Sequence, residues 1–140
     1  MSGMNKQHEI VGRYYDTSIF DYESVRLTKY CPVEFAITSR YLQRWVPQGA
    51  KVAEIGVGVG HYSKLLTSQG CSIHLVDVSE RLLDAACARL RDSGLEGQIV
   101  GVDRASATDL DCLGTGIFDV VLMLGPLYHL LTIEERQRAV

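Results

Sequence analysis

The sequence lacks long apolar runs, a strong excess of either charge, and closely spaced cysteines. Its longest apolar run, Val120 to Leu124, ends at Gly125, whereas a membrane-spanning helix needs about 20 apolar residues. Fourteen Lys and Arg against 17 Asp and Glu give a net charge of −3, so there is no basic excess to hold a nucleic acid or an anionic membrane. We therefore predict that the protein neither spans a membrane nor binds nucleic acid.

The cysteines form no Cys-x-x-Cys pair, and no cluster of His or carboxylate residues accompanies them. This pattern predicts no metal site. The first residues also lack the apolar core of a signal peptide. We expect a cytoplasmic protein in which four reduced thiols are buried as small apolar side chains: Cys31, Cys71, Cys87 and Cys112.

Repeats and low-complexity linkers are absent as well, and 46% hydrophobic with 22% charged residues is the composition of one globular domain. We divide the chain into a helical N-terminal arm, 1–48, that packs on the core, and a second part, 49–140. In the arm, Pro32 suits the first position of a helix that stops before Pro47. Its apolar residues form a broad face that should pack against a sheet: Val33, Phe35, Ile37, Tyr41, Leu42 and Trp45.

From residue 51 onward, short apolar strands alternate with helical segments, a pattern typical of an α/β fold with a parallel sheet. The expected strands are 51–55, 72–76, 98–102 and 118–124, and the expected helices are 61–68, 79–91 and one that begins at Thr132. The fourth strand is nearly continuous in apolar residues, which predicts burial on both faces. The last helix is still running at Val140, so we expect a chain truncated after the fourth strand. That strand would then be a sheet edge open to homodimerisation or strand exchange.

A glycine-rich segment, Glu54-x-Gly56-x-Gly58-x-Gly60, joins the first strand to the next helix. Glycines at such a junction let the backbone turn sharply and approach a ligand closely. A dinucleotide fingerprint beginning at Gly56 would need glycine where His61 stands, which disfavours a pyrophosphate. Asp77 ends the second strand 21 residues after Gly56, where a carboxylate can accept hydrogen bonds from both hydroxyls of a ribose. The segment therefore favours an adenosine-containing ligand.

Four elements in this order resemble the class I S-adenosylmethionine-dependent methyltransferases. They are the segment 54–60, the acidic strand end 75–79, the third strand with its polar end, and the strand 118–121 leading into Leu124-Gly125-Pro126-Leu127-Tyr128-His129-Leu130. The last run is similar to the bacterial small-molecule branch. The resemblance implies a Rossmann-like parallel sheet with flanking helices. It also implies S-adenosylmethionine as cofactor, S-adenosylhomocysteine as product, and a small-molecule methyl acceptor.

The same resemblance assigns cofactor contacts residue by residue. The three glycines of the segment would line the methionine and ribose portion, and Glu54 would support the loop or bind the amino group through water. Asp77 would hold the ribose hydroxyls. The full implied set is Glu54, Gly56, Gly58, Gly60, Asp77, Val78, Ser106, Leu124 and Gly125.

The adenine contact is where this sequence departs from the family. The family usually has Gly-Asp-Ala before a polar-Leu ending, whereas this chain has Ala105-Ser106-Ala107-Thr108-Asp109-Leu110. Ser106 is the candidate to replace the adenine-binding Asp, and Asp103 is the alternative if the loop is rearranged. Val78 would touch the adenine.

His129 and Tyr128 are the candidate catalytic residues. A sulfonium is already activated, so the protein mainly needs to align the acceptor and exclude water. Where the acceptor must lose a proton, His129 is a plausible base because an unperturbed imidazole titrates near pH 6.5. Either residue could instead be a core side chain, and Tyr14, Tyr15 and Arg26 of the arm could close over the cofactor.

Two other functions stay open from the sequence. The chain could be a module that binds the cofactor without a complete acceptor pocket, because the resembled family normally continues with further strands. A fragment of a nucleotide-dependent oxidoreductase is a weaker alternative, which the spacing of Gly56, Gly58 and Gly60 argues against.

Overall fold

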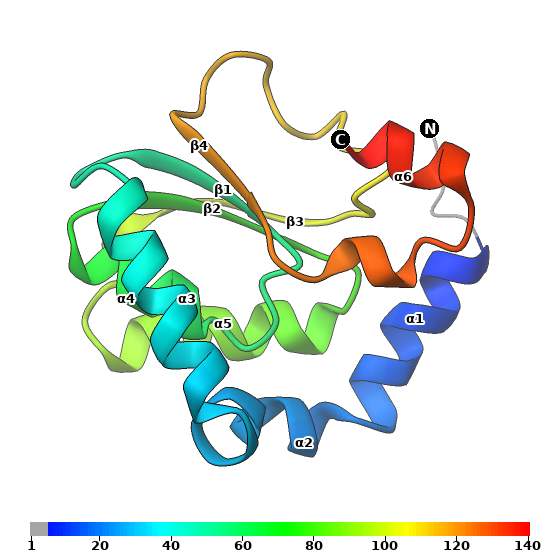
Figure 1. The fold of residues 1–140 in the computed structure, drawn as a ribbon, viewed down its shortest axis with the longest axis horizontal. Helices are drawn as coiled ribbons and strands as arrows, with labels where there is room; N and C mark the ends of the chain where they lie inside the picture. Colours follow the sequence, from blue (N-terminus) through cyan, green and yellow to red (C-terminus); the bar gives the residue numbers. More distant parts are fainter. Residues whose placement is uncertain (1–5) are drawn as a thin grey trace.

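The computed structural model describes residues 6–140 and contains a parallel sheet of four strands (Figure 1). Along the sheet the order is β3-β2-β1-β4, so the first strand of the chain lies in the interior of the sheet. Glu54 of β1 is in register with Leu75 of β2 on one side and with Leu122 of β4 on the other. The strands are β1 (Lys51–Ile55), β2 (Ser72–Asp77), β3 (Ile99–Arg104) and β4 (Val120–Met123).

Helices precede the sheet and connect its strands, as the alternating pattern predicts. The arm contains α1 (Lys6–Thr17), α2 (Phe20–Val25), a π-helical turn η1 (Arg26–Tyr30) and α3 (Pro32–Trp45). The later helices are α4 (His61–Ser68), α5 (Glu80–Asp92) and α6 (Ile133–Ala139), with 3-10 turns η2 (Glu96–Gln98) and η3 (Pro126–His129). The predicted α/β class and helical arm are therefore confirmed.

Helix boundaries follow from local hydrogen bonding. Ser79 caps α5 because its hydroxyl accepts a bond from the backbone N–H of Leu82 at 3.0 Å. Thr132 and Glu135 form a reciprocal capping box at the start of α6. Pro32 occupies the first turn of α3, where its missing N–H costs no helical bond.

The core has two parts, one on each face of the sheet. Helices α3, α4 and α5 cover one face, and Figure 1 shows them together below the sheet. The loop 105–119 and α6 cover the other face, where Ala53, Ile55 and Val76 pack with Ala107 and Leu130. In the described part of the chain, no helix has the length and apolar character needed to cross a bilayer.

The fourth strand differs from its prediction. β4 is four residues long, shorter than the expected segment 118–124, and Val121 is 58% exposed. Within residues 6–140, β4 hydrogen-bonds to β1 alone. The prediction of burial on both faces is wrong, because an apolar run also occurs in a strand that lies at the edge of the sheet. The third strand also runs to Arg104, two residues beyond the predicted end.

Two further burial predictions need correction. In α3, Leu42 is buried and Phe35 packs against the core, but Val33, Ile37, Tyr41 and Trp45 are between 51% and 68% exposed. Only one stripe of the broad apolar face therefore packs inward. Of the four free cysteines, Cys71 is buried and Cys112 is exposed, while the other two are half-buried. The spacing of the cysteines predicts reduced thiols, but it does not predict whether each side chain is buried.

Candidate active site

A cavity of about 500 Å³ lies at the carboxyl ends of β1, β2 and β4, and residues of α1 and η1 line its opposite wall. All but one of the predicted cofactor residues line it. Those present are Glu54, Gly56, Gly58, Asp77, Val78, Ser106, Leu124 and Gly125, together with the catalytic candidates Tyr128 and His129. The topology brings these dispersed segments together because parallel strands end at the same edge of the sheet.

Gly60 is the predicted residue that does not line the cavity. Its φ is +79°, and a Cβ there would lie 2.9 Å from the Cα of Ala86 in α5. Glycine is therefore needed at this position so that α4 and α5 can pack closely. Gly56 has a φ of +77° and does face the cavity, with Pro126 directly against it. The glycine segment thus has one glycine for packing and two that face the ligand space.

Asp77 organises the glycine segment from the end of β2. One carboxylate oxygen accepts the backbone N–H of Gly58 and the other accepts that of Ser79, both at 3.0 Å. Burial raises the pKa of Asp77 to about 6, and these backbone bonds oppose the shift. Each oxygen keeps a lone pair, so the carboxylate can still accept a bond from a ligand hydroxyl.

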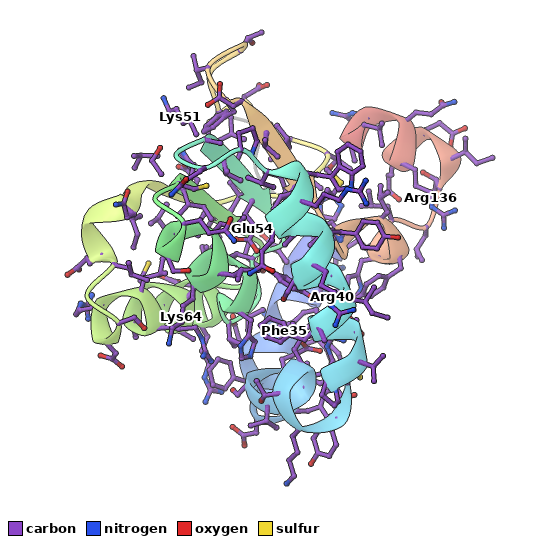
Figure 2. All side chains as sticks on the ribbon, turned by 60° about the vertical axis from the view of Figure 1, so that its left-hand side comes forward. Phe35, Arg40, Lys51, Glu54, Lys64 and Arg136 are labelled. Atoms are coloured by element: carbon purple, nitrogen blue, oxygen red, sulfur yellow. The ribbon has the colours of Figure 1, made fainter. Side chains whose placement is uncertain are left out.

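Glu54 of β1 is buried, and Figure 2 labels it in the interior of the molecule. It is 3% exposed, and Oε2 accepts a bond from the Ser63 hydroxyl of α4 at 2.6 Å. Burial raises the pKa of this carboxyl to about 8, and the bond from Ser63 opposes the rise while the charge of Asp77 adds to it. Glu54 is therefore a buried acid at the floor of the cavity.

Ser106 lines the cavity beyond β3, whereas Asp103 does not. The Ser106 and Thr108 hydroxyls are 3.0 Å apart, and the Thr108 N–H donates to Ser106 Oγ at 3.2 Å. Asp103 instead lies 2.6 Å from Nε2 of His74. The alternative in which Asp103 reaches the ligand is therefore not observed.

A tyrosine of the arm joins the two catalytic candidates. The Tyr15 hydroxyl of α1 lies 2.8 Å from Nε2 of His129 and 3.1 Å from the Tyr128 hydroxyl. Burial, together with the bond to Tyr128, raises the pKa of Tyr15 well above its ordinary value. Burial also lowers the pKa of His129. At neutral pH the phenol is protonated and the imidazole is neutral, and the tautomer of His129 decides which of the two groups donates.

Arg26 is the one Lys or Arg among the described residues that line the cavity. Its guanidinium donates to Glu34 at 2.8 Å and to Glu23 at 3.3 Å, and the remaining N–H groups are available to a ligand. Glu23, Glu34 and Asp77 also line the cavity, as does Glu54, whose raised pKa keeps it protonated at neutral pH. The lining therefore has an excess of carboxylates with a single fixed cation.

The arm makes direct contact with the turn that joins β2 to α5 and with the start of α5. Asp16 accepts a bond from the Ser79 hydroxyl, and its carbonyl accepts one from Arg81 at 2.7 Å. A Cβ at Gly12 would lie 2.7 Å from the carbonyl oxygen of Val78, so α1 approaches this turn as closely as glycine allows. Of the arm residues proposed to close over the ligand, Tyr15 and Arg26 line the cavity and Tyr14 does not.

Sequence reasoning did not find six arm residues that line the cavity: His8, Val11, Glu23, Leu27, Glu34 and Thr38. No motif includes them, so the sequence offers no signal for their placement at the cavity. His8 is 6% exposed, and its Nε2 lies 3.9 Å from Glu135 Oε1 of α6. The docking of α1 against η3 and α6 brings His8 and Val11 to the site, whereas Glu23 and Glu34 reach it from α2 and α3.

A family model described as a methyltransferase domain matches residues 52–140. The chain belongs to this family. The class I methyltransferases use S-adenosylmethionine, and two of the similar solved structures hold it or S-adenosylhomocysteine. The predicted family and cofactor are therefore confirmed.

Curated relatives of this methyltransferase domain include two ubiquinone biosynthesis O-methyltransferases. The protein from Caulobacter sp. (strain K31) is 33% identical over 82 residues, which cover 59% of this chain and 31% of the relative. That from Thiobacillus denitrificans is 32% identical over 91 residues, covering 61% of this chain and 38% of the relative. The chain thus spans about a third of the length of the curated relatives it matches.

Solved structures show the same fold for the methyltransferase domain and its arm. Magnesium protoporphyrin IX methyltransferase from Synechocystis PCC 6803 matches with a TM-score of 0.77 and 22% identity, over 99% of this chain and 71% of that one. The cyclase SpnF matches with a TM-score of 0.78 and 18% identity, over 94% of this chain and 53% of that one. At these identities the likeness establishes architecture, and the reaction needs separate support.

Proposed function

We propose that this domain binds S-adenosylmethionine in the described cavity and transfers its methyl group to a hydroxyl of a small molecule. The observation that carries the proposal is one cavity lined by both the glycine segment with Asp77 and the Tyr15–His129 pair. The glycine segment with Asp77 suits the binding of an adenosine, and the Tyr15–His129 pair suits deprotonation of an acceptor hydroxyl. The oxygen acceptor is supported by the curated relatives, which are named O-methyltransferases.

The residues present fit the proposed cofactor chemically. Asp77 would accept the ribose hydroxyls while continuing to hold Gly58, and the Val78 and Ser106 walls would enclose the base. Arg26 would pair with the carboxylate of the methionine portion, because it is the one fixed cation on the described lining. The excess of carboxylates would favour a ligand that carries a sulfonium and an ammonium group.

Bound S-adenosylmethionine would supply a methyl group already activated on a sulfonium. The residues of the chain would align the acceptor and move one proton. In the tautomer of His129 that carries its proton on Nδ1, the acceptor O–H proton passes to Tyr15 Oη as the proton of Tyr15 passes to Nε2 of His129. Tyr15 therefore never becomes a phenolate, in keeping with its raised pKa, and His129 ends as an imidazolium.

Calorimetric titration with S-adenosylhomocysteine, followed by a methylation assay on a panel of phenols and small alcohols, tests this function. Saturable one-site binding with methylated product supports it in full. Absence of binding by the folded protein contradicts the assignment of the site.

A second candidate is a module that binds the cofactor without methylating an acceptor. One observation favours it: the structurally similar SpnF is a [4+2]-cyclase. Binding of S-adenosylhomocysteine without product from any acceptor would support the module over the enzyme.

We also propose that residues 1–48 act as a cover over a cofactor domain of residues 49–140. Tyr15, Asp16 and Arg26 support this division, because they reach from the arm to the site. The free cysteines support the predicted cytoplasmic location. Self-association through the β4 edge stays a prediction, supported by the exposed Val121.

A further inference from the structure

The cavity wall that follows β3 carries no carboxylate in the described structure. Ala105, Ser106 and Ala107 form this wall, so its one polar side-chain group is the Ser106 hydroxyl. The nearby carboxylate, Asp103, is held by His74 at 2.6 Å. Gly101 leaves room for the His74 ring, because a Cβ there would overlap it. Asp103 therefore contacts His74 and does not line the cavity.

This wall adjoins the ribose-binding position. The backbone N–H of Ala105 donates to the carbonyl of Asp77 at 3.0 Å, which ties the start of the wall to the end of β2. Val78 and Leu82 line the cavity beside it. A nucleoside whose ribose is held by Asp77 consequently places its base against Ala105–Ala107, and Ser106 is the side chain that can read the polar edge of that base.

The Ser106 hydroxyl can present either a proton or a lone pair. Its oxygen accepts the Thr108 N–H at 3.2 Å, and the two hydroxyls are 3.0 Å apart with either able to donate. When Thr108 donates, the Ser106 proton is free for a ligand; when Ser106 donates, its remaining lone pair is free. An ionised carboxylate at this position could only accept hydrogen bonds from a ligand and could not donate one.

We propose that Ser106 makes this site tolerant of the group on carbon 6 of the purine, so that a 6-oxo base binds nearly as well as adenine. Adenine presents an N–H donor at carbon 6 and an acceptor at N1, whereas hypoxanthine presents an acceptor at carbon 6 and a donor at N1. A hydroxyl rotor matches both patterns. The inference rests on the proposed cofactor site and adds a ligand class to it.

The test compares S-adenosylhomocysteine with S-inosylhomocysteine, its 6-oxo analogue, by calorimetric titration of the 140-residue protein. We expect dissociation constants within about fivefold of each other, because neither base leaves the hydroxyl unpaired. Ser106→Asp should bind the adenine ligand about tenfold or more tightly than the 6-oxo ligand. A carboxylate facing the 6-oxo group places two hydrogen-bond acceptors against each other, with no proton between them.

Ser106→Asn is the matched control. Asp and Asn both preserve the turn, because their side-chain oxygen can accept the Thr108 N–H in place of the serine. The Asn amide has both a donor and an acceptor, so this variant should keep the tolerance that Asp removes. Comparing the two variants separates the loss of the donor from the increase in side-chain size.

The outcomes separate the inference from the proposed function. A wild-type preference for the adenine ligand of about fiftyfold or more would overturn the inference while leaving the cofactor site intact. An unchanged ratio in Ser106→Asp would overturn it as well. If the folded wild-type protein binds neither ligand, the proposed function itself is wrong and the inference falls with it.

Discussion

Glu54→Gln should change how the free energy of unfolding depends on pH. Glu54 is buried, and its pKa is raised to about 8 in the folded protein from an ordinary value of 4.5. A carboxyl whose folded pKa is raised stabilises the fold most at low pH, and this contribution is lost as pH rises through the folded pKa. The loss therefore extends over about pH 4.5 to 8.

The size of the effect follows from the two pKa values. Between pH 6 and pH 8, the contribution of Glu54 falls by about 2 kcal/mol. Other groups titrate in this window, among them His61 and His129, whose pKa values burial lowers. They are present in both proteins, so the difference in unfolding free energy between wild type and Glu54→Gln reports the Glu54 carboxyl together with its coupling to Asp77, whose pKa is raised to about 6.

Urea denaturation of both proteins at pH 6, 7 and 8 measures this difference. We expect the advantage of wild type over Glu54→Gln to shrink by about 2 kcal/mol across the series. Ser63→Ala provides a second variant: it removes a bond to Oε2 that favours the ionised carboxylate, so the loss should move to higher pH. A wild-type advantage that stays constant from pH 6 to 8 would refute the reasoning.

Four further predictions test the site and the fold. Asp77→Asn should weaken S-adenosylhomocysteine binding by about tenfold or more in calorimetry, because the amide NH₂ would face a backbone N–H of Gly58 or Ser79; unchanged affinity would contradict the assigned role. Tyr15→Phe should lower kcat on the order of a hundredfold with cofactor affinity retained, whereas the exposed Tyr14→Phe should not; equal kcat values would exclude the relay. Gly60→Ala should destabilise by about 3 kcal/mol in urea denaturation, against about 1 kcal/mol for Gly49→Ala, since both have positive φ but only Gly60 meets Ala86; matching losses would disprove the packing role. Val121→Lys should convert any dimer to monomer in light scattering, and a dimer that persists would place its interface away from the β4 edge.

Local signals in the sequence predicted most element boundaries. The α4 bounds were predicted exactly as observed, and Ser79 and Thr132 were recognised as positions where helices begin. Such signals succeed because a cap or a helix-breaking glycine acts within a few residues of itself. The glycine segment and Asp77 were found for the same reason, since their spacing along the chain carries the geometry of one βαβ unit.

The errors concern which face of an element is covered. The apolar run of β4 is predicted to be buried on both faces, but Leu122 is buried while Val121 is exposed. The stripe of α3 that includes Trp45 is likewise predicted to be buried, but it is largely exposed. Side-chain periodicity identifies an apolar face without naming the element that packs on it. In the same way, Gly60 was assigned to the ligand because its chain position suits the motif, while the approach of α5 decides that it serves packing.

The sequence by itself determined the family and the α/β order of elements, and it singled out the glycine segment and Asp77, which the structure brings to one cavity. Tertiary structure alone decided that Tyr15 meets His129, more than a hundred residues away along the chain, and that Asp103 turns to His74 while Ser106 faces the cavity. The physical reason is the distance along the chain over which each kind of interaction acts. Caps, turns and strand ends are governed by neighbouring residues, whereas a site assembled from several segments depends on how those segments pack.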